Sequence, residues 1–282
     1  MAAQTLRPAA WLIVDTESSD ETLVVAEEMA AEQPWVVVRQ LRLGGAVMRG
    51  GPIVRAFHFA LESLPAECDI IVKVDADTSF EPDYFDRLVA EFELDARLGI
   101  AGGTGYEQQS DGAWRQRHGT GSGVWGASRA YRRVCLDELL PLEERMGWDT
   151  IDLVGAEVRG WSTRAIADLP FRHHRREGER DPSRFSAYLK VGEAAHYMGY
   201  RLSYLAIRTV FRAVRDPVAI GIPFGYLAAT LRRERRRADV AIRDSVREQQ
   251  RLSRLHLRAR EALRPRTELT EPQNPQGPPA RT

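Results

Sequence analysis

The stretch Asp69-Ile70-Ile71-Val72-Lys73-Val74-Asp75-Ala76-Asp77-Thr78 decides how the rest of this chain is interpreted. A short run of Ile and Val that ends in acids is typical of a buried strand reaching the edge of a sheet. In open α/β sheets, ligands bind beyond the carboxyl ends of the strands. The sequence therefore predicts a binding site at Asp75 and Asp77, and the alternative is a strand-end turn with solvated acids.

Only Ala76 separates these two carboxylates. Two carboxylates this close repel one another unless a cation relieves the repulsion. Hard oxygen ligands suit Mg²⁺ or Mn²⁺. We therefore expect a divalent metal as cofactor, with the phosphates of a nucleotide as its second set of ligands.

Strand-like and helical segments alternate on both sides of this stretch. Ser18 and Glu21 are spaced as a capping box, Pro34 is expected to end the helix that follows, and Pro82 is expected to begin another. Further on we expect a helix that contains Tyr131 and a helix that begins at Trp148. The predicted strands cover residues 11–14, 35–38, 70–74, 100–105 and 162–167. This alternation predicts an α/β fold with a mostly parallel, doubly wound sheet.

Composition sets the outer limits of the prediction. With 282 residues the chain fits one large domain with an appendage, and its 40 basic and 40 acidic residues balance, so net charge indicates no partner. Two cysteines are too few for a disulfide framework, which favours a reducing, cytoplasmic setting. We find no signal peptide and no apolar run of roughly 18 residues that would span a membrane.

The C-terminal third has a different character. Residues 210–231 are largely apolar but are broken by prolines and glycines, and five arginines follow within residues 232–237. This pattern predicts either a re-entrant or interfacial membrane segment or a helical hairpin packed on the domain. The arginines would meet anionic headgroups, with a solvated helix face as the alternative. Nucleic-acid binding is disfavoured because no aromatic residues are interleaved with the arginines. We divide the chain into a domain at 1–203, a helical, membrane-associating extension at 204–263 and a disordered tail at 264–282.

Three separated motifs then agree in their order. They are Val14-Asp15-Thr16-Glu17-Ser18-Ser19-Asp20, Asp75-Ala76-Asp77 followed by Pro82-Asp83-Tyr84, and Trp148-Asp149 followed by Gly160 and His173-His174. Together they resemble the family-two glycosyltransferases of the GT-A fold over roughly residues 11–176. The resemblance implies an inverting, metal-dependent transferase that uses a nucleotide-diphosphate sugar.

The resemblance also implies roles for individual residues. Asp15 would contact the nucleotide base or ribose, Asp75 would face the ribose and sugar, and Asp77 would bind the metal. His173 or His174 would complete the metal shell, and we do not choose between them here. Arg49 lies in a loop from which a basic side chain can reach the phosphates, with a solvated loop arginine as the alternative.

For catalysis, Asp149 matches the acid that serves as general base in inverting members. This chain has Trp148-Asp149 where relatives have Glu-Asp. Asp152 lies three residues further along the expected helix, on the same face, and is the second candidate for base or for orienting the acceptor. The alternative treats both acids as first-turn residues favoured by the helix dipole.

One departure from the family concerns the beginning of the chain. Relatives start with a strand that holds the nucleotide base, whereas residues 1–10 do not have a strand pattern. Its loss would expose sheet edges and part of the base pocket. We expect either that the intact protein begins further upstream or that another segment fills the gap.

The sequence thus predicts a glycosyltransferase that moves a sugar to a glycan or lipid-linked acceptor, cytoplasmic or peripheral at the inner face of the plasma membrane, with no nucleic-acid partner. One alternative is an inactive transferase-like protein that binds a membrane or a partner. Another is a haloacid-dehalogenase-type phosphatase, although the motif of such enzymes has Thr or Val at the position that Ser79 occupies here.

Overall fold

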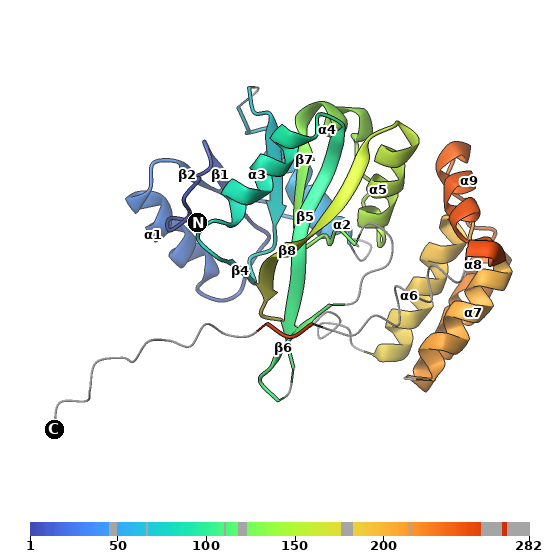
Figure 1. The fold of residues 1–282 in the computed structure, drawn as a ribbon. Helices are drawn as coiled ribbons and strands as arrows, with labels where there is room; N and C mark the ends of the chain where they lie inside the picture. The colour runs from blue at the N-terminus through green and yellow to red at the C-terminus, as the bar shows by residue number, and fades with distance from the viewer. Residues whose placement is uncertain are drawn as a thin grey trace.

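The computed structural model describes residues 1–44, 50–65, 67–109, 111–117, 123–175, 183–214, 216–254 and 267–269. An α/β body is joined to a group of helices at one end of the molecule (Figure 1). The body contains the elements β1 (Trp11–Asp15), α1 (Thr22–Glu32), β2 (Val36–Gln40), α2 (Gly51–Leu61), β3 (Ile70–Val74), β4 (Thr78–Phe80), α3 (Tyr84–Leu94), β5 (Leu98–Gln108), β6 (Trp114–Gln116), β7 (Ser128–Arg132), α4 (Arg133–Leu139), α5 (Trp148–Val158) and β8 (Ser162–His173). The helical group contains α6 (Arg184–Tyr197), α7 (Leu202–Ala213), the 3-10 turn η1 (Pro217–Ile220), α8 (Gly221–Leu231), α9 (Val240–Gln249) and the 3-10 turn η2 (Leu252–Arg254).

The strands form two sheets in the described part of the chain. The larger sheet has the order β3-β7-β5-β8-β4, with β6 paired to β5. Within it β5 and β8 run parallel, and all its other neighbours are antiparallel. The α/β class is confirmed, but the pairing is more mixed than the predicted, mostly parallel sheet.

The difference arises largely at residues 128–132. We predicted Tyr131 inside a helix, but it lies in β7, and α4 begins only at Arg133. Strand β7 pairs with both β3 and β5, and its residues alternate between the two faces of the sheet. The segment Ser-Arg-Ala-Tyr-Arg is short and has no marked apolar periodicity, so tertiary pairing decides its conformation.

The predicted capping box is also wrong. Helix α1 begins at Thr22 with Glu21 at its N-cap, and no side chain caps it. The backbone N–H of Ser18 instead donates to Asp15 Oδ1 at 3.2 Å, so this residue belongs to the turn after β1.

Two layers of core cover the two faces of the larger sheet. On one face Tyr84, Phe85 and Leu88 of α3 pack against β5, β7 and β8. On the other face helices α2, α4 and α5 enclose Ile71, Ile100 and Tyr131. Because successive strand residues point to opposite faces, both faces of these strands are buried.

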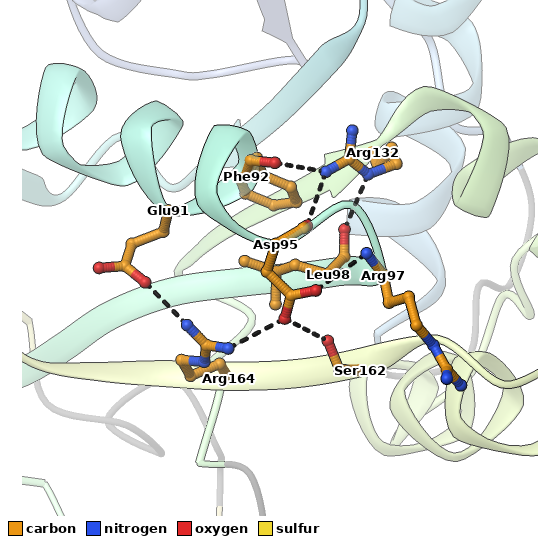
Figure 2. A network of polar contacts seen from close by, with 8 residues as sticks. All are labelled: Glu91, Phe92, Asp95, Arg97, Leu98, Arg132, Ser162 and Arg164. Atoms are coloured by element: carbon orange, nitrogen blue, oxygen red, sulfur yellow. Dashed lines mark hydrogen bonds and ion pairs between the residues drawn. The ribbon is translucent and has the colours of Figure 1, made fainter.

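A polar network clamps the end of α3 to three strands (Figure 2). The Arg132 guanidinium, from β7, donates to the carbonyls of Phe92, Asp95 and Leu98, at 2.6, 3.0 and 3.0 Å. The Asp95 carboxylate accepts from Ser162 and Arg164 of β8. Since the last carbonyls of a helix have no partner within it, one arginine here supplies donors that the helix lacks.

The smaller sheet consists of β1 and β2, which run parallel. Among the described residues β1 pairs with β2 alone and β3 with β7 alone, so each keeps one edge without a strand partner. Residues 1–10 form no strand. Instead Gln4 is buried against the start of α3, where its side chain donates to the carbonyl of Glu81 at 2.8 Å.

In the helical group, α6 and α8 cross at very close range. A Cβ on Gly225 would lie 1.9 Å from the carbonyl oxygen of Leu189, and one on Gly192 would lie 2.0 Å from that of Ile222. Glycine is therefore required on both helices at this crossing. The group also packs on the body through α9, whose Ile242 and Val246 meet Ile151 and Val154 of α5.

For residues 210–231 the sequence predicted either a membrane segment or a helical hairpin packed on the domain. Within this range the structure describes the end of α7, the turn η1 and helix α8. In the described part of the chain, no helix has both the length and the apolar character needed to cross a membrane. Of the predicted tail, residues 267–269 lie beside β6, where Gln116 N–H donates to Thr267 O and Leu269 N–H to Trp114 O.

Candidate active site

The turn after β3 and the end of β8 meet at one edge of the larger sheet. Strand β3 ends at Val74, and the backbone N–H of Asp75 still donates to Ala127 O at 2.9 Å. The Thr78 hydroxyl donates to Asp75 O at 2.6 Å and closes the turn. Strand β4 then pairs antiparallel with β8 so that Thr78 stands opposite His173. This register brings His173 to the two acids, from far along the sequence.

Asp75, Asp77 and His173 each offer one ligand atom to a group whose atoms lie within 4.8 Å of one another. His173 Nε2 lies 3.3 Å from Asp77 Oδ1, and Glu107 Oε1 lies 4.0 Å from Nδ1 of the same ring. The hydrogen bond from His173 lowers the pKa of Asp77. Burial opposes the charged imidazole, but the hydrogen bond to Asp77 and the charges of the surrounding carboxylates raise the pKa of His173.

These donors suit a divalent cation. Carboxylate oxygens and an imidazole nitrogen are ligands that Mn²⁺ accepts, and Mg²⁺ favours the carboxylates. Within the part of the chain that the structure describes, the buried His173 Nδ1 atom has no hydrogen-bond partner, so its protonation can follow the ligand at Nε2. Trp125 covers the ring at a centroid distance of 4.5 Å. The residues present therefore fit the metal that the sequence predicts.

The neighbouring histidine has different contacts. His174 Nε2 lies 2.8 Å from the Ser79 hydroxyl, and its ring meets Trp114 edge-on at 5.3 Å. Its backbone N–H donates to Asp77 O at 2.8 Å. Of the two predicted histidines, the group that could hold a metal contains His173 and not His174.

Lys73 also belongs to this site, although it was not among the predicted site residues. Its ammonium pairs with Asp75 and donates to Gly126 O at 2.6 Å, with its side chain 10% exposed. The ammonium also lies 5.7 Å from the Trp148 ring centroid. A lysine inside an otherwise apolar strand was the available signal, because a buried charge needs a partner.

Asp149 lies next to Gly126. Helix α5 begins at Trp148 after Gly147, whose φ of +86° is the left-handed conformation that glycine adopts readily. A Cβ on Gly126 would lie 3.5 Å from Asp149 Oδ2 and 3.2 Å from Trp148, so the start of α5 packs closely on this loop. The half-buried Asp149 carboxylate therefore lies beside the residue whose carbonyl holds Lys73.

Asp152 occupies a different environment from Asp149. It is fully enclosed, pairs with the buried Arg129 and accepts a hydrogen bond from Tyr131 at 2.5 Å. Burial raises the pKa of Asp152 to about 6, although Arg129 and Tyr131 act in the opposite direction. Arg129 also donates to Asp149 O at 2.9 Å and to Val124 O at 2.7 Å, so this pair joins α5 to the loop before β7.

Two predicted nucleotide-sugar contacts remain. Asp15 is buried at the end of β1, where it accepts from Ser18 N–H and its own carbonyl accepts from Leu41 N–H. Its contact with a nucleotide stays a prediction. Arg49 lies outside the described residues.

The amino-acid sequence matches a known family over about half of its length. Residues 1–144 of the 282 match the family model described as glycosyl transferase family 2, which is just over half of the chain. The chain belongs to glycosyl transferase family 2. The prediction of a glycosyltransferase is confirmed, and the phosphatase alternative is excluded.

Solved structures add the fold of this glycosyltransferase. A mannosyltransferase from Pyrobaculum calidifontis, solved with GDP-Man and Mn²⁺, is 14% identical, with a TM-score of 0.50. The match covers 93% of this chain and 73% of that one. GalNAc-T7, solved with UDP, GalNAc and Mn²⁺, is also 14% identical, with a TM-score of 0.46 over 65% of this chain and 42% of that chain. No curated protein matches the sequence. The GT-A fold prediction is confirmed.

Proposed function

We propose that this family 2 glycosyltransferase moves a sugar from a nucleotide-diphosphate sugar to a hydroxyl group, with inversion at the anomeric carbon. The observation that carries the proposal is the group of Asp75, Asp77 and His173 within 4.8 Å, with Asp149 beyond Gly126. Such a reaction needs two parts, which are a site for a metal-bound diphosphate and a carboxylate that is separate from this site.

The donor side of the proposed site consists of Asp75, Asp77 and His173. When bound there, Mn²⁺ or Mg²⁺ would stabilise the negative charge that develops on the departing diphosphate. Lys73 holds the Asp75 carboxylate by an ion pair and is itself anchored to Gly126 O. Trp125 packs against the buried His173 ring. The protein thus contributes ligands whose positions are set before the donor binds.

On the acceptor side we assign the general base to Asp149. Its carboxylate takes the proton of the acceptor hydroxyl while that oxygen bonds to the anomeric carbon. The bond from this carbon to the diphosphate oxygen breaks, and the nucleoside diphosphate leaves with the electron pair. Asp152 is buried on Arg129 and Tyr131, so we assign it the role of holding α5 in position and not that of the base.

The acceptor that we propose is a glycan or a lipid-linked molecule at the inner face of the plasma membrane.

The mannosyltransferase with the shared fold was solved with GDP-Man and Mn²⁺, which makes GDP-mannose the first donor to test. UDP-sugars are the second class of donor to test.

Calorimetric titration of GDP and UDP, with and without Mn²⁺, into the chain and its Asp77→Ala variant tests the donor site. We expect manganese-dependent binding of one nucleotide that the variant loses. Manganese-dependent hydrolysis of the matching nucleotide sugar, also lost in the variant, would show that the site is catalytic. Binding without hydrolysis or transfer would favour the inactive, partner-binding alternative, and equal binding by both proteins would refute the metal site.

A further inference from the structure

Helix α7 presents an apolar face to the outside of the molecule. Val210 and Leu202 are both 65% exposed, and Val214, the residue that follows the helix, is 82% exposed. The exposed apolar residues recur at helical spacing and are Leu202, Ala206, Ile207, Val210, Phe211 and Val214. They cover about half of the helix surface, and on that half Ser203 is the one polar residue.

The polar side of α7 faces the protein. Arg208 and Arg212 are half-buried, and Arg208 stacks over the Tyr200 ring at 5.7 Å. Leu205 and Thr209 are buried on the same side. A surface helix of a globular protein normally turns its charges to water and its apolar face inward. Helix α7 has the opposite arrangement, because its apolar residues are exposed and its arginines are half-buried.

Helix α8 packs on α7 and has a second apolar stripe. Ile220, Phe224, Leu227 and Leu231 are each more than half exposed and follow one another every three or four residues. Gly221, Ile222, Gly225, Tyr226 and Ala229 form the buried side of the helix. Single exposed apolar residues are ordinary, but two such stripes on adjacent helices indicate a binding surface.

Positive charge lies at the end of the α8 stripe. Arg232, Arg233, Arg235 and Arg236 follow Leu231, with Glu234 among them, and all are exposed. Arg232 pairs with Glu193 and Glu234, which leaves Arg233, Arg235 and Arg236 as the charges that a headgroup can meet. The segments 202–214 and 217–231 contain no Asp or Glu. An apolar face without acids and with arginines at its border is complementary to a bilayer whose surface is anionic.

We propose that α7 and α8 form a membrane-docking surface that binds the interface of an anionic lipid bilayer. The apolar stripes enter the boundary between headgroups and acyl chains, and the arginines contact the headgroups. This proposal concerns a surface distinct from Asp75, Asp77 and His173, and it does not depend on sugar transfer. A second copy of the chain fits the surface less well, because it would bring the same arginines and no acids on its own stripes.

Vesicle flotation with the full chain tests the surface. Vesicles of phosphatidylcholine alone are compared with vesicles containing about one-third phosphatidylglycerol, at low and high salt. We expect binding to the anionic vesicles that weakens with salt. A variant with Val210→Ser, Phe224→Ser and Leu231→Ser should bind about tenfold less or weaker still. The matched control carries Val24→Ser, Val25→Ser and Leu94→Ser, which are equally exposed on α1 and α3, and should bind like the parent.

A second variant keeps the test decisive if the first one misfolds. Arg233→Gln, Arg235→Gln and Arg236→Gln should remove the preference for anionic vesicles while the apolar stripes stay intact. A parent protein that stays with the soluble fraction in both vesicle types would overturn the proposal. So would a dimer in sedimentation velocity that dissociates in the serine variant without any vesicle binding, because the face would then pair two copies. Nucleotide titration of the same samples shows separately whether the donor site is intact.

Discussion

The Nε2 atom of His173 lies 3.3 Å from Oδ1 of Asp77, so the last residue of β8 meets the turn that follows β3. The contact depends on the antiparallel pairing of β4 with β8, which sets Thr78 opposite His173. The contact brings an imidazole to Asp75 and Asp77, whose own segment contains no histidine. The two histidines at the end of β8 consequently have separate predicted functions.

Replacing either histidine by alanine distinguishes these functions. We expect His173→Ala to lower the affinity for Mn²⁺ at least about 100-fold, because it removes a proposed ligand. His174→Ala removes a contact to Ser79 and should change this affinity much less. Manganese titration by electron paramagnetic resonance gives both values. Equal losses in the two variants would contradict the assignment.

Asp149→Asn should separate catalysis from binding. Asparagine cannot accept the acceptor proton, so we expect transfer to fall by about 10²–10⁴-fold. Affinity for the nucleotide with Mn²⁺ should stay within error of the parent, because Asp149 is not among the proposed metal ligands. Asp137→Asn, on the exposed side of α4, is the control and should leave both quantities unchanged. Full activity of the Asp149→Asn variant would show that another residue is the general base.

Asp152→Ala should act on stability. The substitution leaves the completely buried Arg129 without its carboxylate, and breaking a buried pair in this way costs about 3–5 kcal/mol. Urea denaturation monitored by circular dichroism measures the free energy of unfolding. A double substitution of Arg129 and Asp152 by Met and Leu should recover part of the loss, because no buried charge remains. Unchanged stability in Asp152→Ala would show that the pair does not hold α5.

His58 should make the free energy of unfolding depend on pH. Burial lowers the pKa of His58, and Nε2 accepts a hydrogen bond from the Leu142 backbone at 3.0 Å, which requires the neutral ring. The unfolded chain binds a proton near pH 6.5, whereas the folded chain resists it, so stability falls as the pH drops below about 6.5. Urea denaturation at pH 7.5 and 5.5 measures this fall. The fall should be smaller in His58→Gln, and an identical fall in both proteins would contradict the prediction.

The two cysteines should differ in reactivity. Cys135 is fully buried, and this burial raises the pKa of its thiol to about 12, so almost no thiolate exists at neutral pH. Cys68 is half-buried. We expect a thiol reagent at pH 8 to modify Cys68 in the native protein and both residues in urea, as measured by mass spectrometry. Modification of Cys135 in native Cys68→Ser would indicate that the core around α4 opens.

Local sequence patterns predicted most of the body. The strands at β1, β2 and β3 and the helices at α3 and α5 all fall within a few residues of their expected places, because periodicity and flanking Gly or Pro are local signals. Strand β8 begins at Ser162 as expected but runs on to His173, beyond the predicted end at residue 167. The pattern failed for β7, whose Tyr131 was expected in a helix. Its conformation depends on pairing with β3 and β5, which no local signal contains.

For the candidate site, the sequence alone predicted the acids Asp75 and Asp77, because a strand end and paired carboxylates are local features. Lys73 was missed, since its role depends on Gly126, which lies on another segment. Asp149 and Asp152 look equivalent in sequence at neighbouring positions of one helix. Only burial distinguishes them, because Arg129 and Tyr131 enclose one carboxylate and leave the other beside the site.

The sequence by itself determined the family, the α/β class and the paired acids, all of which are encoded in short segments. Tertiary structure decided which histidine joins those acids and which carboxylate of α5 is enclosed. It also decided that the apolar faces of α7 and α8 point outward. The physical reason is that these properties depend on strand register and on packing between distant segments.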